Sequence, residues 1–206
     1  MDGLRVVHAD DALVVVDKPA GVLSVPGLGA GLRDNLTATV QALFADARVV
    51  HRLDQATSGL MLFARGVAMQ RALSMAFAAR QVDKEYVAVV EGLIDGVEGS
   101  IMAPLSADWP RRPRQKVDAE HGKPALTHWR LLERGAHTSR LRLQPVTGRT
   151  HQLRVHLQSI GHPVVGDTLY APAPQLGARL LLHATRLELL HPRTQQRCVY
   201  VSAPPF

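Results

Sequence analysis

The carboxylate of Asp54 lies between two apolar runs without a second acid beside it. Asp54 lies in the stretch HRLDQATSGL, residues 51–60, between an arginine and a Thr-Ser-Gly turn. Apolar runs that are typical of strands come before and after this stretch, so the acid is expected at a junction of two strands. An Asx turn explains such an aspartate without any chemistry. On this motif alone the turn is the default interpretation, and the alternative is a lone carboxylate that acts as a nucleophile or a general base.

Three other features favour the chemical interpretation. Arg154 lies in a predicted helix that follows a glycine turn, and a buried arginine there would keep Asp54 ionised. Tyr86 lies in a valine-rich strand, where its ring either packs in the core or forms the floor of a pocket. Trp109 is next to a basic run, and this combination is typical of proteins that bind single-stranded or looped RNA. The run consists of Arg111, Arg112, Arg114 and Lys116.

Other kinds of site are less well supported. His151 and His156 are five apart on a predicted helix and point in different directions, and no HExxH is present, so we predict no metal site. The glycines at 27–31 lack the spacing of a nucleotide-binding loop. Ser58 lies in T-S-G rather than in G-x-S-x-G. The turn at 147–150 precedes a predicted helix, so it is a candidate for binding one phosphate.

Length and composition limit the class of protein. The 206 residues suit one domain, or one domain with two lobes, and 46% hydrophobic residues allow a substantial core. The net charge is +6, and arginine supplies most of the positive charge. The single cysteine, Cys198, excludes an internal disulfide framework. No apolar run has the length of a membrane span and no signal segment is present, so a cytoplasmic protein is expected.

The predicted elements indicate an α+β fold, because strands mix with three helices without regular alternation. One helix carries Leu36, Val40, Leu43 and Phe44 at helical spacing after a cap at Asp34, and another begins at a cap on Thr150. The segment 103–123 is expected to be a surface loop or ribbon. The remaining predictions are a helix at 66–81 and strands at 13–18, 49–53, 60–64, 84–92, 127–133, 139–146, 180–192 and 197–204.

Several stretches together resemble the RluA-type pseudouridine synthases over nearly the whole chain. They are DKPAGVLSVPG (17–27), HRLDQATSGLMLFAR (51–65), KEYVAVVEG (84–92), TGRTHQLRVHLQSIGHPVVGDTLY (147–170) and LLLHATRLELLHP (180–192). The resemblance implies the pseudouridine synthase fold, a mixed and largely antiparallel sheet with flanking helices and a central cleft. It implies an isomerase that needs neither a cofactor nor a metal.

The resemblance also implies roles for individual residues. Asp54 would be the catalytic aspartate, and Arg154 would pair with it. Tyr86 would stack on the flipped uracil, and Arg52 would fill the gap that the uridine leaves in the RNA. The expected pocket residues are Leu180 and Leu182, and the expected RNA-binding residues besides Arg52 are Arg111, Arg112, Arg114, Lys116, Arg149 and His151.

Within that family, residues 108–117 and 122–127 are most similar to the subgroup that modifies both the tRNA anticodon stem-loop and a hairpin of 23S rRNA. The resemblance favours a monomer. It predicts a single catalytic domain, residues 1–206, without the N-terminal S4-type domain of many relatives, because the first strand begins almost at once.

The implied reaction detaches uracil from C1′ of the ribose and rejoins it through C5, after the base has been flipped out of the RNA. The sequence leaves the route open: Asp54 either adds to the sugar or base, or abstracts a proton from the ribose. Two other interpretations also stay open. One is a non-catalytic protein that binds RNA in the same cleft, and the other is a small-molecule hydrolase with Asp54 as its nucleophile.

Overall fold

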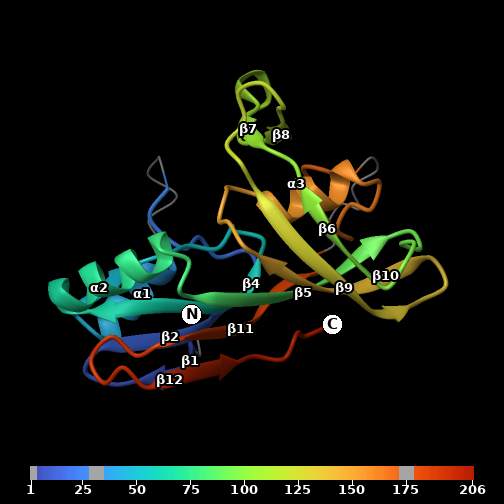
Figure 1. Ribbon diagram of the computed structural model, residues 1–206. Helices are drawn as coiled ribbons and strands as arrows, with labels where there is room; N and C mark the ends of the chain where they lie inside the picture. Colours follow the sequence, from blue (N-terminus) through green and yellow to red (C-terminus); the bar gives the residue numbers. More distant parts are fainter. Residues whose placement is uncertain (1–3, 28–34, 172–178) are drawn as a thin grey trace. The chain divides into compact units, whose positions relative to one another are not determined.

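The computed structural model describes residues 4–27, 35–171 and 179–206. Strands and helices mix in the order expected of an α+β protein, with three α-helices in this part of the chain (Figure 1). The chain divides into two compact units, which are described separately. The first comprises residues 1–84 and 183–205, and the second comprises residues 85–182 and 206. None of the described helices is long and apolar enough to span a membrane.

The first unit contains a sheet in which β2 pairs with β1 and β4, and β4 pairs with β3 and β11. β12 extends the sheet beside β11. All these pairs are antiparallel except β4 with β11. The strands are β1 (Arg5–Ala9), β2 (Leu13–Lys18), β3 (Ala47–Val49), β4 (Ser58–Arg65), β11 (Leu182–Leu190) and β12 (Arg197–Val201), and the helices are α1 (Leu36–Leu43) and α2 (Gly66–Ala78).

The apolar runs of β2 and β4 are continuous because both strands lie inside the sheet and bury residues on both faces. Leu73 of α2 packs on this core, with Met69 and Phe77 partly buried beside it, as the helical spacing predicted. Two details of α1 differ from the prediction. Asn35 caps the helix by accepting a hydrogen bond from the backbone N–H of Ala38, whereas Asp34 lies outside the described residues. Leu43, expected in the core, is 61% exposed because it ends the helix.

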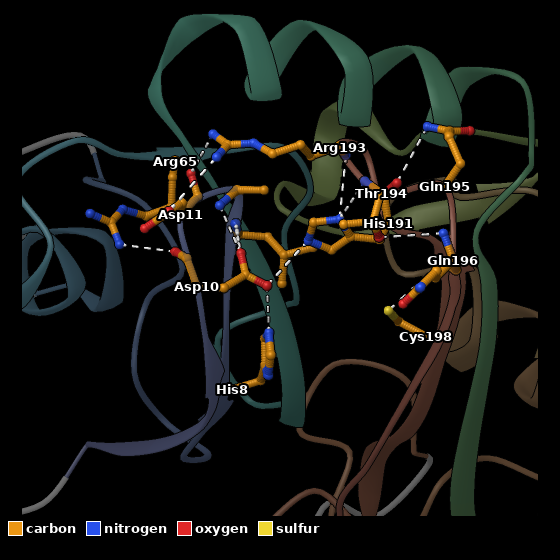
Figure 2. A network of polar contacts seen from close by, with 12 residues as sticks. His8, Asp10, Asp11, Arg65, His191, Arg193, Thr194, Gln195, Gln196 and Cys198 are labelled. Carbon is orange, nitrogen blue, oxygen red and sulfur yellow. Dashed lines mark hydrogen bonds and ion pairs between the residues drawn. The ribbon is translucent and has the colours of Figure 1, made fainter.

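A polar network around Asp10 joins distant segments of the first unit (Figure 2). Its carboxylate contacts Nε2 of His8 at 2.7 Å and Nε2 of His191 at 3.1 Å, and it accepts the backbone N–H groups of Ala12 and Leu13. Burial of Asp10 opposes ionisation, but these hydrogen bonds and the nearby histidines outweigh it and hold the pKa of Asp10 well below its ordinary value. The network therefore ties the β1–β2 turn to the β11–β12 turn.

The second unit is built on four antiparallel strands in the order β5-β10-β9-β6. A two-stranded ribbon, β7 with β8, stands out from this sheet (Figure 1) and confirms the ribbon predicted within residues 103–123. We call residues 105–117 the arm. The elements are β5 (Asp83–Glu91), β6 (Glu98–Met102), β7 (Leu105–Ala107), the short 3-10 helix η2 (Trp109–Arg111), β8 (Gln115–Val117), β9 (Leu126–Arg134), β10 (Thr138–Pro145) and α3 (Gln152–Ser159).

Helix α3 begins differently from the prediction. Its N-cap is His151, which has a left-handed backbone with φ of +53°, and not Thr150. The side chain of Gln152 closes the preceding turn, because its Oε1 accepts the Thr147 hydroxyl and the Arg149 backbone N–H. Part of the donor capacity that made the turn a candidate phosphate site is therefore already used.

Candidate active site

Asp54 lies in the loop that connects β3 to β4. The predicted strand at 49–53 is wrong beyond Val49, where β3 ends. The backbone N–H of Thr57 donates to the Asp54 carbonyl at 3.1 Å and forms the turn that leads into β4. Asp54 itself is half-buried, and Arg52 is exposed. The loop thus carries an acid and an accessible arginine two residues apart.

The segment that follows β2 holds this loop from both sides of Asp54. The Ser24 hydroxyl donates to the Leu53 carbonyl at 2.6 Å and accepts the Leu53 N–H at 3.1 Å. The backbone N–H of Gly21 donates to the Gln55 carbonyl at 2.8 Å. Because both neighbours of Asp54 are fixed through their backbones, the position of its Cα is well determined.

Lys18 makes a third connection and is a residue that sequence reasoning missed. Its side chain is fully buried, and Nζ donates to the carbonyls of Pro19, Val22 and Gln55 at 2.9, 2.8 and 3.0 Å. Burial lowers the pKa of Lys18 to about 8, although the charge of Asp54 acts in the opposite direction. A lysine that ends a run of buried valines just before Pro-Ala-Gly was the available signal.

His51 anchors the start of the loop on β4. Its Nε2 accepts the backbone N–H of Leu62 at 2.9 Å, and its ring stacks on Phe77. Burial, assisted by the charge of Lys84, lowers the pKa of His51 to about 3, so the ring is neutral at physiological pH.

Ser58 is a buried residue in a hydrogen-bond network and is not placed as a nucleophile. It is buried, and its Oγ lies 2.9 Å from Nδ1 of the buried His183, whose Nε2 contacts Ser202. A hydroxyl in such a site is not exposed to a substrate, which agrees with the lack of a G-x-S-x-G turn.

The second unit positions the other predicted pocket residues. Tyr86 is half-buried on β5, opposite Leu143 of β10. Three residues along β5, Val89 donates its N–H to the Leu181 carbonyl, which places the segment 180–182 beside this strand. Leu180 and Leu182 are both buried.

Arg154 is 4% exposed on the first turn of α3, and its guanidinium is bound by Asp167. Nε donates to Oδ2 at 2.7 Å and Nη2 donates to Oδ1 at 2.8 Å, so the pair is bidentate and the plane of the guanidinium is fixed. Sequence reasoning missed Asp167, although an acid after Val-Val-Gly was a visible signal. Arg154 and Tyr86 belong to the second unit and Asp54 to the first, so the expected pairing of Arg154 with Asp54 stays a prediction.

The four basic residues of the arm have different surroundings. Two of them have acidic partners: Arg111 contacts Asp108 at 2.8 Å, and Lys116 contacts Asp118 at 3.6 Å. Arg112 instead lies over the ring of Trp109, 3.7 Å from its centroid, and Trp109 is 68% exposed. Arg114 is half-buried over the ring of Tyr170. The arm therefore presents an exposed cation–π pair, Arg112 on Trp109, as well as positive charge.

The two residues predicted near the turn at 147–150 differ in accessibility. Arg149 is exposed, and its Nε donates to the Pro124 carbonyl at 3.1 Å. His151 is half-buried, and its Nδ1 lies 2.7 Å from the hydroxyl of Tyr170. Among residues 4–27, 35–171 and 179–206, no group of three His, Cys, Asp or Glu side chains is arranged to hold a metal ion.

Residues 12–159 match the family described as RNA pseudouridylate synthase. The chain belongs to the pseudouridine synthase family. Similar proteins of this family are named dual-specificity RNA pseudouridine synthase RluA. The one from Vibrio cholerae is 47% identical over 93% of this chain and 79% of its own length. The one from Pasteurella multocida is 45% identical over 98% of this chain and 94% of its own length.

Solved structures of pseudouridine synthases share the fold. Human RNA pseudouridylate synthase domain containing 1 matches with a TM-score of 0.83 and 30% identity, over all of this chain and 85% of that one. Human RNA pseudouridylate synthase domain containing 4 matches with a TM-score of 0.79, over 98% of this chain and 88% of that one. This pseudouridine synthase is thus an isomerase that converts uridine in RNA to pseudouridine, as the RluA-type motifs predicted.

Proposed function

We propose that this pseudouridine synthase modifies two classes of RNA, the tRNA anticodon stem-loop and a hairpin of 23S rRNA. The observation that carries the proposal is its similarity, over more than nine-tenths of the chain, to relatives whose name states dual specificity. The arm sequence at 108–117 supports the same subgroup. We further propose that the enzyme acts as a monomer in the cytoplasm and uses no cofactor.

In the proposed mechanism, Asp54 is the catalytic residue. The bond between C1′ and N1 of the uridine breaks and a bond between C1′ and C5 forms. The proton on C5 leaves, N1 gains a proton, and no electrons are exchanged with another molecule. A carboxylate suits this reaction because it can serve as nucleophile or base and is regenerated at the end. The fixed backbone on both sides of Asp54 supports this role, since a reacting group must be held in place.

The other roles follow from the surroundings of each side chain. We propose that Arg154, held rigid by Asp167, pairs with Asp54 and keeps it ionised. Tyr86 would stack on the flipped uracil, with Leu180 and Leu182 as apolar walls. Arg52, exposed two residues before Asp54, would fill the gap in the RNA and recover part of the lost stacking.

Further RNA contacts are proposed on the arm and beside α3. Arg112 and Trp109 would bind an unpaired base by stacking, while Arg111, Arg114, Lys116, Arg149 and His151 would contact the RNA backbone. Positive charge steers RNA to the enzyme, and stacking on an aromatic ring contributes affinity without sequence preference.

The first test compares the wild-type enzyme with Asp54→Asn on both RNA classes. Carbodiimide treatment followed by reverse transcription should give a new stop at one uridine in the tRNA and one in the rRNA with wild type, and none with Asp54→Asn. The variant should still bind RNA within about threefold of wild type, because Asn keeps the volume of Asp. Turnover near wild type in Asp54→Asn would reject Asp54 as the catalytic residue. Modification of a single RNA class would reject dual specificity.

A further inference from the structure

Tyr170 lies where the arm meets helix α3 and is used by neither the predicted site nor the proposed mechanism. Its side chain is 4% exposed, and it forms a small core with Leu105 at the base of the arm and Val155 of α3. A tyrosine buried this deeply usually has a partner for its hydroxyl. Here the hydroxyl contacts two different elements.

The hydroxyl of Tyr170 bridges the arm and the start of α3. It accepts the backbone N–H of Gln115 in β8 at 2.8 Å, and it lies 2.7 Å from Nδ1 of His151, the N-cap of α3. The oxygen accepts from Gln115 and still has both a hydrogen and a second acceptor site for Nδ1. The tautomer of the imidazole decides which of the two groups donates in the contact between His151 and Tyr170.

The ring and backbone of Tyr170 add two further connections. The guanidinium groups of Arg114 and Arg154 lie 5.4 and 5.1 Å from the centroid of its ring, within the range of cation–π attraction. Its backbone N–H donates at 3.1 Å to Oδ1 of Asp167, the same oxygen that accepts Nη2 of Arg154. One residue therefore contacts the arm, the N-cap of α3 and the ion pair of Arg154.

The N-cap of α3 has an uncommon backbone conformation. His151 has a φ of +53°, which is unfavourable for a residue with a Cβ, and its side chain makes no hydrogen bond to the helix N-terminus. Its imidazole is directed instead to Tyr170. The contact with Tyr170 therefore fixes the side chain of the N-cap residue without capping the helix.

We propose that Tyr170 is a positioning residue that transmits contact between the arm and RNA to Arg154. RNA that shifts the arm moves the Gln115 N–H, and Tyr170 follows because its hydroxyl is bound there. The ring of Tyr170, which lies against the Arg154 guanidinium, and its backbone contact with Asp167 then determine the position of that guanidinium. This inference rests on the proposed roles of the arm in RNA binding and of Arg154 in catalysis.

Steady-state kinetics on an anticodon stem-loop RNA can test this coupling with Tyr170→Phe and Trp109→Ala, singly and together. Tyr170→Phe keeps the ring and removes the bridging hydroxyl, so we expect kcat to fall about tenfold with KM nearly unchanged. Trp109→Ala should raise KM and also lower kcat. In the double variant the rise in KM should persist, while kcat should fall no further than in Tyr170→Phe alone.

Two further variants separate coupling from simple packing. Tyr200→Phe is the matched control, because the hydroxyl of Tyr200 is buried in the first unit and has no hydrogen-bond partner among the described residues; its kcat should equal that of wild type. His151→Asn tolerates the left-handed backbone but is too short to reach Tyr170, so it should reproduce the loss in kcat. This variant decides the question if Tyr170→Phe fails to fold.

Each result supports or overturns the inference. An unchanged kcat in Tyr170→Phe and His151→Asn, or independent losses that multiply in the double variant, would mean that Tyr170 only packs. If Trp109→Ala leaves KM unchanged, the proposed role of the arm fails and the coupling fails with it. If Trp109→Ala raises KM but the kcat effects multiply, only the inference fails and the arm keeps its role in RNA binding.

Discussion

At the scale of single residues, Lys18 shows how a buried charge can organise the loop that carries Asp54. An ammonium group has three donors, and all three are used by backbone carbonyls on two segments, 19–22 and the Gln55 position. Burial lowers its pKa to about 8, so the group is still mostly charged at neutral pH. The charged ammonium group of Lys18 therefore holds the backbone at Gln55, next to Asp54.

Replacement of Lys18 by methionine should test this role. Lys18→Met keeps the length of the side chain but removes the Nζ donor from three carbonyls, of which the Gln55 carbonyl keeps the Gly21 N–H. We therefore expect a loss of about 2 kcal/mol in the free energy of unfolding. Activity should fall about tenfold, because the loop that carries Asp54 loses one of its attachments. Urea unfolding and single-turnover kinetics measure the two effects. Lys123→Met is the control at an exposed lysine, and equal stability of the two variants would contradict the proposed role.

At the scale of elements, the arm combines charge with stacking in one short ribbon. Arg111 and Lys116 have acidic partners on the arm or just beyond it, whereas Arg112 and Trp109 are stacked on each other and exposed. Charge pairing reduces the positive potential that the first two residues offer to phosphates. The stacked pair should then dominate the affinity of the arm.

Two single variants can test whether stacking or charge dominates the RNA affinity of the arm. Trp109→Ala should weaken RNA binding by about 1 to 3 kcal/mol, roughly five- to 150-fold, with little change in the salt dependence. Arg111→Gln should weaken it less, since Asp108 already neutralises this guanidinium. Titration of RNA at two salt concentrations gives both the affinity and its salt dependence for each variant. The opposite order of the two effects would show that charge, and not stacking, determines affinity at the arm.

The junction of β4 and β11 depends on one glycine in the stretch that contains Asp54. Gly59 has a φ of +109°, and a Cβ there would lie 2.3 Å from the carbonyl oxygen of Ala184 in β11. Gly59→Ala should therefore reduce the free energy of unfolding by about 2 to 4 kcal/mol. Gly161→Ala is a matched control, because Gly161 also has a positive φ but has no atom within 4 Å of the added Cβ. Its loss should be about 1 kcal/mol, and equal losses in urea unfolding would exclude a steric cause.

At the scale of the whole molecule, the first unit is assembled from both ends of the chain. Its N-terminal hairpin and its C-terminal strands meet at Asp10, which contacts His8 on one side and His191 on the other (Figure 2). The carboxylate is ionised in the folded state at unusually low pH because of these contacts and the two backbone N–H groups. The free energy of unfolding of this unit should thus decrease at acidic pH.

The pH dependence follows from the lowered pKa of Asp10. Its stabilising contribution is complete above the pKa of an unfolded aspartate, about 4, and is lost as the pH falls toward the lower folded-state value. Asp10→Asn should cost about 1 kcal/mol at pH 7, since the group is partly exposed, and the difference from wild type should shrink below about pH 4. Thermal unfolding across this range measures it. Asp11→Asn, at a 91% exposed carboxylate, should show no such trend, and a constant difference for Asp10→Asn would exclude its ionisation as the cause.

Local patterns in the sequence determined most of the elements and made Asp54 the candidate acid. The spacing of Leu73 and its neighbours predicted α2, and the Pro- and Arg-rich composition of 103–123 predicted a loop or ribbon, because these signals come from residues close in the chain. Motifs likewise identified the family and made Asp54 the candidate catalytic acid. Cap positions were less predictable: Asn35 caps α1 and His151 is the N-cap of α3, whereas the predicted caps were Asp34, which lies outside the described residues, and Thr150.

The partners that hold the functional side chains were decided by tertiary structure alone. Lys18 reaches Gln55, Arg154 is bound by Asp167, and Tyr170 accepts from Gln115, and each of these pairs is far apart in the sequence. Spacing along the chain reports which residues share a face of a helix or strand, but it carries no information about which distant segment supplies a donor or acceptor. Those partners exist only after the sheet and the arm have brought the segments together. The sequence could therefore name a candidate acid for this synthase but not the residues that keep its surroundings in place.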